Sequence, residues 1–211
     1  MKLTLTDREL EFLHESNKIE DIENIDYRKP ENAIPGAGHV GAFLDAMNLA
    51  KDVAITVADI CRWQSMITGE QLRFGVEIAT AGIGKIRSPE LPINVKVGSS
   101  KTPSFLRVPE MLDDLIREMR VDTAVATKSD ALEIGAAAVG DYLCEFEWIH
   151  PFIDGNGRTG RILANLVGMR HGLPLLVFKS SDRQKFFESH GQRHLMRAYI
   201  YELAKTTLKE Q

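Results

Sequence analysis

Hydrophobic residues recur at helical spacing along most of this 211-residue chain. Between Leu132 and Phe146 the apolar positions alternate at spacings of four and three residues, as on one face of an α-helix. Thr6 and Glu9 form a capping box, which predicts a helix running roughly to residue 23. The same periodicity predicts further helices over residues 40–50, 55–68, 108–119, 162–170, 181–190 and 193–208.

One segment, residues 82–98, departs from the helical pattern. It is rich in glycine and proline, and Ile93, Val95 and Val97 alternate with polar residues. Alternation with a period of two is typical of a strand, so the segment predicts a short β-hairpin or extended flap between helices. The expected fold class is therefore an all-α bundle with one small β flap.

Composition narrows the class of protein without indicating its chemistry. The chain is 44% hydrophobic and 27% charged with a net charge of −4, which is typical of a globular domain and gives no electrostatic reason to expect nucleic acid. The N-terminus becomes charged at once, and the longest apolar run, residues 173–178, is too short for a membrane span. Cys61 and Cys144 lie in no ligand motif, so free buried thiols in a cytoplasmic protein are expected, with a disulfide as the alternative.

The segment from His150 to Arg161 carries groups suited to chemistry on phosphates. It reads His-Pro-Phe-Ile-Asp-Gly-Asn-Gly-Arg-Thr-Gly-Arg and lies between two amphipathic segments. Its glycines allow backbone N–H groups to converge on an anion at the start of a helix, and Arg158 lies one helical turn before Arg161. Asp154 offers an oxygen ligand for Mg²⁺, and His150 is suited to act as a general base. Together these groups indicate phosphoryl or nucleotidyl transfer.

This segment resembles the motif of Fic proteins, His-x-Phe-x-(Asp/Glu)-Gly-Asn-(Gly/Lys)-Arg-x-x-Arg, at every specified position. The resemblance extends over roughly residues 40–205 and implies a Fic-type helical bundle. On this basis residues 31–211 are expected to form the Fic domain, with an inhibitory helix at residues 1–30 packed against it.

The resemblance also implies an activity, the transfer of AMP from ATP to a Ser, Thr or Tyr hydroxyl of a target protein with release of pyrophosphate. His150 would deprotonate the hydroxyl, Asp154 would hold Mg²⁺, and Asn156 would bond the α-phosphate. The flap at residues 82–98 would pair with an extended segment of the target. Binding of the nucleotide phosphates would fall to the glycine and arginine positions, Gly155, Gly157, Arg158 and Arg161.

An N-terminal segment is similar to the Fic inhibitory motif, (Ser/Thr)-x-x-x-Glu-(Gly/Asn). Ser16 and Glu20 are four residues apart and expected on one helix face, and the resemblance implies that Glu20 pairs with Arg161 and blocks productive ATP binding. Asp21 departs from the motif, which has Gly or Asn at that position. Thr206 and Glu210 give a weaker match near the C-terminus, so a C-terminal inhibitory segment is the alternative.

Other functions are compatible with the same residues. A Fic relative can phosphorylate its target, transfer another nucleotide or remove AMP, although the intact Gly157 favours the ordinary AMP orientation. A non-catalytic nucleotide-binding module is a further alternative, which the complete set of catalytic residues disfavours. The target protein and the modified residue are not encoded in any recognisable pattern, and homo-oligomers are compatible with the resemblance.

Overall fold

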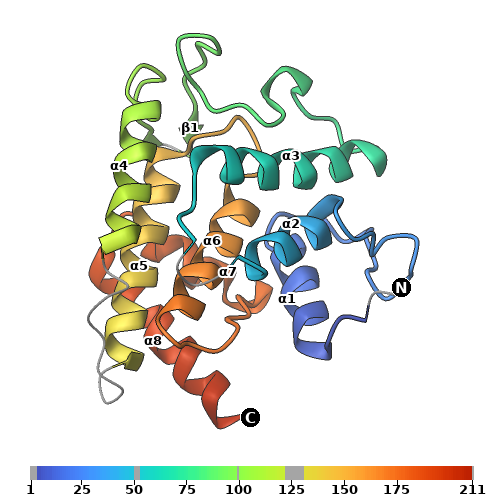
Figure 1. The fold of residues 1–211 in the computed structure, drawn as a ribbon, viewed down its shortest axis with the longest axis vertical. Coiled ribbons are helices and arrows are strands. Elements are labelled where there is room, and N and C mark those ends of the chain that lie inside the picture. The colour runs from blue at the N-terminus through green and yellow to red at the C-terminus, as the bar shows by residue number, and fades with distance from the viewer. Residues whose placement is uncertain (1–3, 50–52, 99, 122–130, 211) are drawn as a thin grey trace.

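The computed structural model describes residues 4–49, 53–98, 100–121 and 131–210, and its fold is helical, as predicted (Figure 1). The two strands, β1 (Lys96–Val97) and β2 (Ser100–Lys101), form an antiparallel hairpin. Short 3₁₀ turns occur at Thr80–Gly82 and Ser180–Asp182. The α-helices are α1 (Asp7–Lys18), α2 (Gly38–Met47), α3 (Val57–Arg73), α4 (Val108–Val121), α5 (Ala131–Ile149), α6 (Asn156–Arg170), α7 (Arg183–Ser189) and α8 (Arg193–Lys209).

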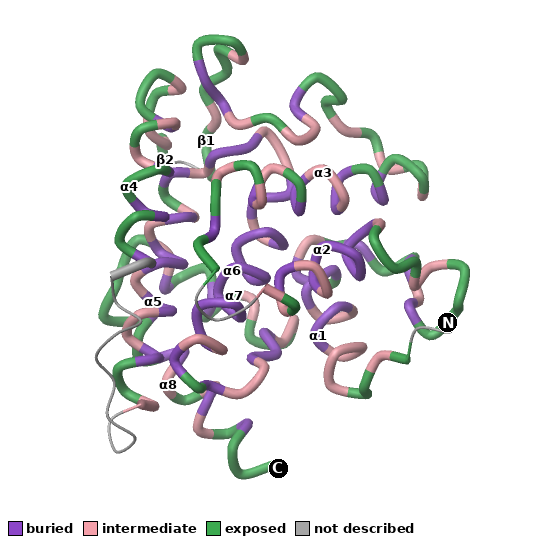
Figure 2. The backbone as a smooth tube through the Cα atoms, viewed as in Figure 1, coloured by how far each residue is buried: buried purple, intermediate pink, exposed green. Residues whose placement is uncertain are grey.

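Helix α6 lies at the centre of the bundle and is buried on every side (Figure 2). It contacts α1, α2, α3 and α5, so its surroundings are protein rather than solvent. Its buried residues include Arg158 and Arg161 as well as the apolar Ile162 and Leu163. Burying two guanidinium groups costs free energy unless they meet anions or hydrogen-bond acceptors. The start of α6 is therefore a part of the core that needs such partners.

Helix α5 packs along α8 and α6, and its glycines explain how the helices approach so closely. A Cβ at Gly140 would come within 2.9 Å of the backbone of Arg197 on α8. A Cβ at Gly135 would come within 2.9 Å of Leu173. Close packing against these neighbours accounts for two glycines inside the helix, where glycine lowers helix propensity.

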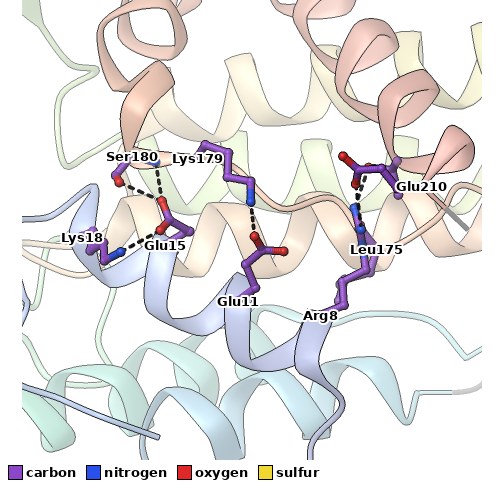
Figure 3. Close-up of polar contacts among 9 residues, drawn as sticks. Arg8, Glu11, Glu15, Lys18, Leu175, Lys179, Ser180 and Glu210 are labelled. Carbon is purple, nitrogen blue, oxygen red and sulfur yellow. Dashed lines mark hydrogen bonds and ion pairs between the residues drawn. The ribbon is translucent and has the colours of Figure 1, made fainter.

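Helix α1 belongs to the same hydrophobic core as the rest of the chain, to which it contributes Phe12 and Leu13, followed by Ile19 just after the helix. Polar contacts join its outer face to residues 175–180 (Figure 3). Glu15 accepts two hydrogen bonds of 2.7 Å from the backbone and hydroxyl of Ser180, and Glu11 pairs with Lys179. The domain limits at residues 1–30 and 31–211 remain a prediction.

The end of α1 differs from the prediction. The capping box at Thr6 is present, but the helix ends at Lys18 instead of continuing to residue 23. The N–H of Ile22 donates to Asn17 and that of Asp21 to Lys18, the hydrogen bonds of a Schellman turn, and Asp21 has a φ of 58°. Glu20 therefore lies in the turn after the helix, and the expectation that it shares a helix face with Ser16 was wrong.

Other predicted boundaries were also wrong, and the helix predicted over residues 162–170 begins at Asn156. The hairpin spans Lys96 to Lys101 and so extends beyond residue 98, while residues 83–95 are mostly irregular apart from a bridge between Ser88 and Leu91. Helix α3 continues to Arg73, five residues beyond its predicted end. No helix within the described residues is long and apolar enough to cross a bilayer.

Candidate active site

The loop between α5 and α6 has a tightly defined backbone. His150 has a φ of 47° and Gly155 a φ of 79°, so the chain turns sharply at both ends of the loop. Phe152 is fully buried and anchors the loop in the core. The Asn156 side chain accepts a hydrogen bond of 2.9 Å from the Phe152 N–H and donates one of 3.0 Å to its carbonyl. In this structure, Asn156 thus closes the loop; its predicted contact with the α-phosphate remains a prediction.

The buried guanidinium of Arg87 fixes the start of this loop, a role that the sequence analysis missed. It donates to the carbonyls of Ile149 at 2.7 Å, His150 at 2.9 Å and Pro103 at 3.0 Å. The backbone N–H of Arg87 also donates to the carbonyl of Pro151 at 2.7 Å. Arg87, which precedes the hairpin, thus connects the backbone of His150 with that of Pro103, which follows the hairpin. An isolated arginine in a Gly/Pro-rich stretch carries no sequence signal for carbonyl partners distant along the chain.

Gln64 on α3 fixes the other end of the loop and was also missed. Its amide donates to the carbonyl of Asp154 at 3.0 Å and accepts from the N–H of Gly84 at 2.6 Å. The helical periodicity of α3 indicated only that position 64 could face inward. Gln64 holds the Asp154 backbone, while the side chain of Asp154 accepts a 2.5 Å hydrogen bond from the N–H of Gly155.

The two arginines of α6 both have guanidinium nitrogens without a hydrogen-bond partner among the described residues. Arg158 is 1% exposed, and its Nε and Nη1 are unpaired; Nη1 of Arg161 is unpaired as well. Burial lowers the pKa of Arg158, although the carboxylates of Glu20 and Asp154 oppose this shift. Buried cationic donors without partners are suited to receive an anion of several charges, such as a chain of phosphates.

The contact predicted between Glu20 and Arg161 of α6 is present. Arg161 donates to Oε1 of Glu20 at 2.8 Å and to the hydroxyl and carbonyl of Ser16 at 3.0 and 2.7 Å. Burial disfavours the charged form of Glu20, but the positive charges of Arg161 and Arg158 outweigh it and lower the pKa of Glu20. Glu210, the alternative, instead pairs with Arg8 at 3.4 Å.

Asn17, beside Ser16, anchors the end of α1 in the core. Its amide donates to the hydroxyl of Tyr27 at 2.9 Å, and its oxygen lies 3.1 Å from Nδ1 of His39 on α2. The Tyr27 hydroxyl in turn donates to Glu70 on α3 at 2.6 Å. This buried network connects α1 with two core helices, so the position of Ser16 is set by the core and not by surface contacts.

Glu20 lies between two hollows. The first, about 560 Å³, is lined by His150, Arg161 and the hairpin residues Val97 and Lys101, and we call it the flap hollow. The second, about 590 Å³, lies beside Asp154 and Arg158, and we call it the loop hollow. Glu20 lines both hollows, and a Cβ added to Gly157 would collide with its carboxylate. The glutamate thus occupies the space over the first turn of α6.

The flap hollow also contains a buried carboxyl group that the sequence analysis missed, that of Glu147 on α5. Burial raises the pKa of Glu147 to about 7 and lowers the pKa of His150 to about 4. The neighbouring His190 also has its pKa lowered by burial to about 4. At neutral pH both histidines are therefore neutral, and His150 can accept a proton without first losing one.

The residues around the loop hollow fit a magnesium–nucleotide complex. Mg²⁺ is usually held by one or two carboxylates together with phosphate oxygens, and Asp154 supplies one carboxylate. The unpaired nitrogens of Arg158 and the first N–H groups of α6 would face the phosphates. In this structure the N–H of Gly155 donates to Asp154, and its role in binding phosphate remains a prediction.

Comparison with known proteins identifies the family. Residues 54–167, more than half of the chain, match the Fic/DOC family model. The chain therefore belongs to the Fic/DOC family, as the sequence motif predicted.

Curated relatives include the protein adenylyltransferase Fic of Nematostella vectensis, 34% identical over 108 residues, and the protein adenylyltransferase fic-1 of Caenorhabditis briggsae, 28% identical over 180 residues. These matches cover 47% and 84% of this chain but 24% and 32% of the relatives, so the chain spans about a quarter to a third of their length.

Solved structures show the same fold. The Fic-1 fragment of C. elegans superposes with a TM-score of 0.70 at 20% identity, covering 98% of this chain and 63% of the fragment. A Fic-domain signalling protein of Bacteroides thetaiotaomicron gives a TM-score of 0.71 at 20% identity, covering 95% and 84%.

Proposed function

We propose that this chain is a protein adenylyltransferase held in a self-inhibited state by Glu20. The observation that carries the proposal is the position of Glu20, which pairs with Arg161 and occupies the space over the first turn of α6, between His150 and Arg158. The names of the curated relatives support the same activity.

The transfer would proceed by direct attack of a target hydroxyl on the α-phosphorus of ATP. The Nε2 atom of His150 takes the hydroxyl proton as the new oxygen–phosphorus bond forms. The bond from the α-phosphorus to its bridging oxygen breaks, and pyrophosphate leaves. Arg158 and Arg161 offset the charge on the departing phosphates. Mg²⁺ bound at Asp154 would supply further neutralisation of phosphate charge.

The target would bind through the hairpin. The edges of β1 and β2 are exposed, and an extended segment can add to such an edge by backbone hydrogen bonds. Val97 and Lys101 line the flap hollow together with His150, so a segment paired there would pass close to the base.

ATP labelled at either the α- or the γ-phosphate tests the reaction class. We expect the Glu20→Gly protein to transfer the α-label to protein in a cell extract, and the Glu20→Gly/His150→Ala protein to transfer neither. Transfer of the γ-label instead would identify a kinase. Failure to transfer either label, with ATP still bound, would refute the proposed activity and favour a nucleotide-binding module.

Inhibition should also depend on Arg183, because the turn that carries Glu20 is attached to α7. Asp21 accepts two hydrogen bonds from Arg183, at 2.5 and 2.8 Å, on the protein surface. Exposed ion pairs are weak and sensitive to salt. We expect Arg183→Gln to raise the basal rate by about two- to fivefold at low salt. Initial rates of α-label transfer measure this effect.

The matched control is Arg193→Gln, which removes a comparable surface pair with Glu145 at 2.7 Å, away from Glu20. Added salt should raise the basal rate of the wild type but not that of Arg183→Gln. Equal rates for the wild type and Arg183→Gln at low salt would mean that the buried contacts alone hold the turn.

A further inference from the structure

Glu147 is a buried acidic residue that the proposed mechanism does not use. Its side chain is 8% exposed and lines the flap hollow together with His150. Its carboxylate lies against α6, where a Cβ added to Gly160 would come within 2.7 Å of Oε1. That oxygen has no hydrogen-bond partner among the described residues. A buried carboxyl group left unpaired in a reaction cavity requires an explanation.

One partner available to Glu147 is the base itself. Its Oε2 lies 3.8 Å from Nδ1 of His150, which forms no well-aligned hydrogen bond among the described residues, although the backbone of Glu147 also interacts with the ring. The two residues are three positions apart where α5 ends, and the left-handed backbone of His150 turns the loop at that point. A movement of about 1 Å would bring the two atoms within hydrogen-bond distance.

We propose that Glu147 is a positioning residue for His150, accepting a hydrogen bond from Nδ1–H while Nε2 receives the proton of the target hydroxyl. This inference rests on the proposed adenylyl transfer. The hydrogen bond fixes the tautomer in which Nε2 is free, and the carboxylate stabilises the imidazolium that forms as the proton arrives. Because Glu147 touches neither ATP nor the target hydroxyl, its effect is transmitted through His150.

The charge on Glu147 is linked to the inhibitory glutamate. The groups that face Glu147 come from several elements: Glu20 after α1, His150 after α5, Arg161 on α6 and His190 after α7. Burial raises the pKa of Glu147 to about 7, Arg161 opposes that rise, and the charge of Glu20 adds to it. Loss of Glu20 therefore lowers the pKa of Glu147 and increases its charged fraction at neutral pH.

Kinetics in the Glu20→Gly protein test the proposal. We expect Glu147→Gln to lower kcat by about tenfold or more while KM for ATP stays unchanged, and Glu147→Asp to restore part of the loss. The matched control is Glu145→Gln on the same helix, which should leave both constants unchanged. With Glu147 intact, kcat should rise with pH below about 7 as the carboxyl group ionises, and the Gln variant should lack that rise. An unchanged kcat and pH profile in Glu147→Gln would overturn the proposal.

An NMR titration of the His150 ring, without nucleotide, separates this proposal from the proposed activity. In Glu147→Gln the ring signals of His150 should show no change near pH 7, because no carboxyl group beside Nδ1 remains to ionise. In the wild type itself, the ring signals should shift again near pH 7 as Glu147 titrates. Absence of the shift near pH 7 from the wild type would refute the positioning role whether or not the protein transfers AMP.

Discussion

Replacing His150 by alanine in the Glu20→Gly protein is expected to lower the rate of AMP transfer by about 10²- to 10⁴-fold, the usual contribution of a general base. The loss should appear in kcat. The Kd for ATP should stay nearly unchanged, because the residues proposed to bind the nucleotide, Asp154, Arg158 and Arg161, remain in place. Single-turnover transfer of α-label and equilibrium binding of ATP measure the two quantities separately.

The pH dependence of the parent Glu20→Gly protein supplies a second check on the same residue. Burial lowers the pKa of His150 to about 4, and the neutral ring is the active form of a base. Protonation of His150 should therefore add a second loss of activity as the pH falls toward about 4, well below the range of an ordinary histidine and below the loss expected near pH 7 from Glu147. Removing Glu20 takes away a negative charge that raises the pKa of His150. The fall in activity caused by protonation of His150 should therefore not move to higher pH.

The exposed His194 on α8 provides the control, and His194→Ala should retain the full rate. If His150→Ala retained the rate as well, another group would have to accept the proton, and the assignment of the base would be wrong.

The helical elements could be predicted because each carries its own signal. Thr6 and Glu9 specified the start of α1, and the periodicity from Leu132 to Phe146 specified α5. The end of α1 could not be predicted in this way. A Schellman turn usually has glycine at its left-handed residue, and here Asp21 holds that conformation while it binds Arg183 on α7. A contact between residues so far apart in sequence leaves no local pattern.

The residues of the candidate site also differ in whether a local sequence pattern indicates them. The motif from His150 to Arg161 is contiguous, so its residues were recognisable together. Arg87, Gln64 and Glu147 act through contacts with this motif, two of them from segments far away in the chain. Their environment in the folded protein, and not their spacing, distinguishes them from ordinary surface residues.

Replacing Glu20 by glycine is expected to raise AMP transfer by about 10- to 150-fold. In the wild type, Glu20 forms a charge-assisted hydrogen bond of 2.8 Å to Arg161. Such a bond contributes about 1.5–3 kcal/mol when it is protected from solvent, which corresponds to that range of rates. Initial rates of α-label transfer at saturating ATP measure the change, and Glu20→Gln, which keeps a hydrogen bond but loses the charge, should give an intermediate value.

The released state should remain folded, because Arg161 keeps its hydrogen bonds to the hydroxyl and carbonyl of Ser16. Glu210→Gly serves as the control for the alternative C-terminal inhibitory segment, since Glu210 pairs with Arg8 and lines neither hollow beside Glu20. It should leave the rate unchanged. A rise in Glu210→Gly with none in Glu20→Gly would place inhibition at the C-terminus, and the Glu20–Arg161 pair would then be a structural contact of α1 with the core.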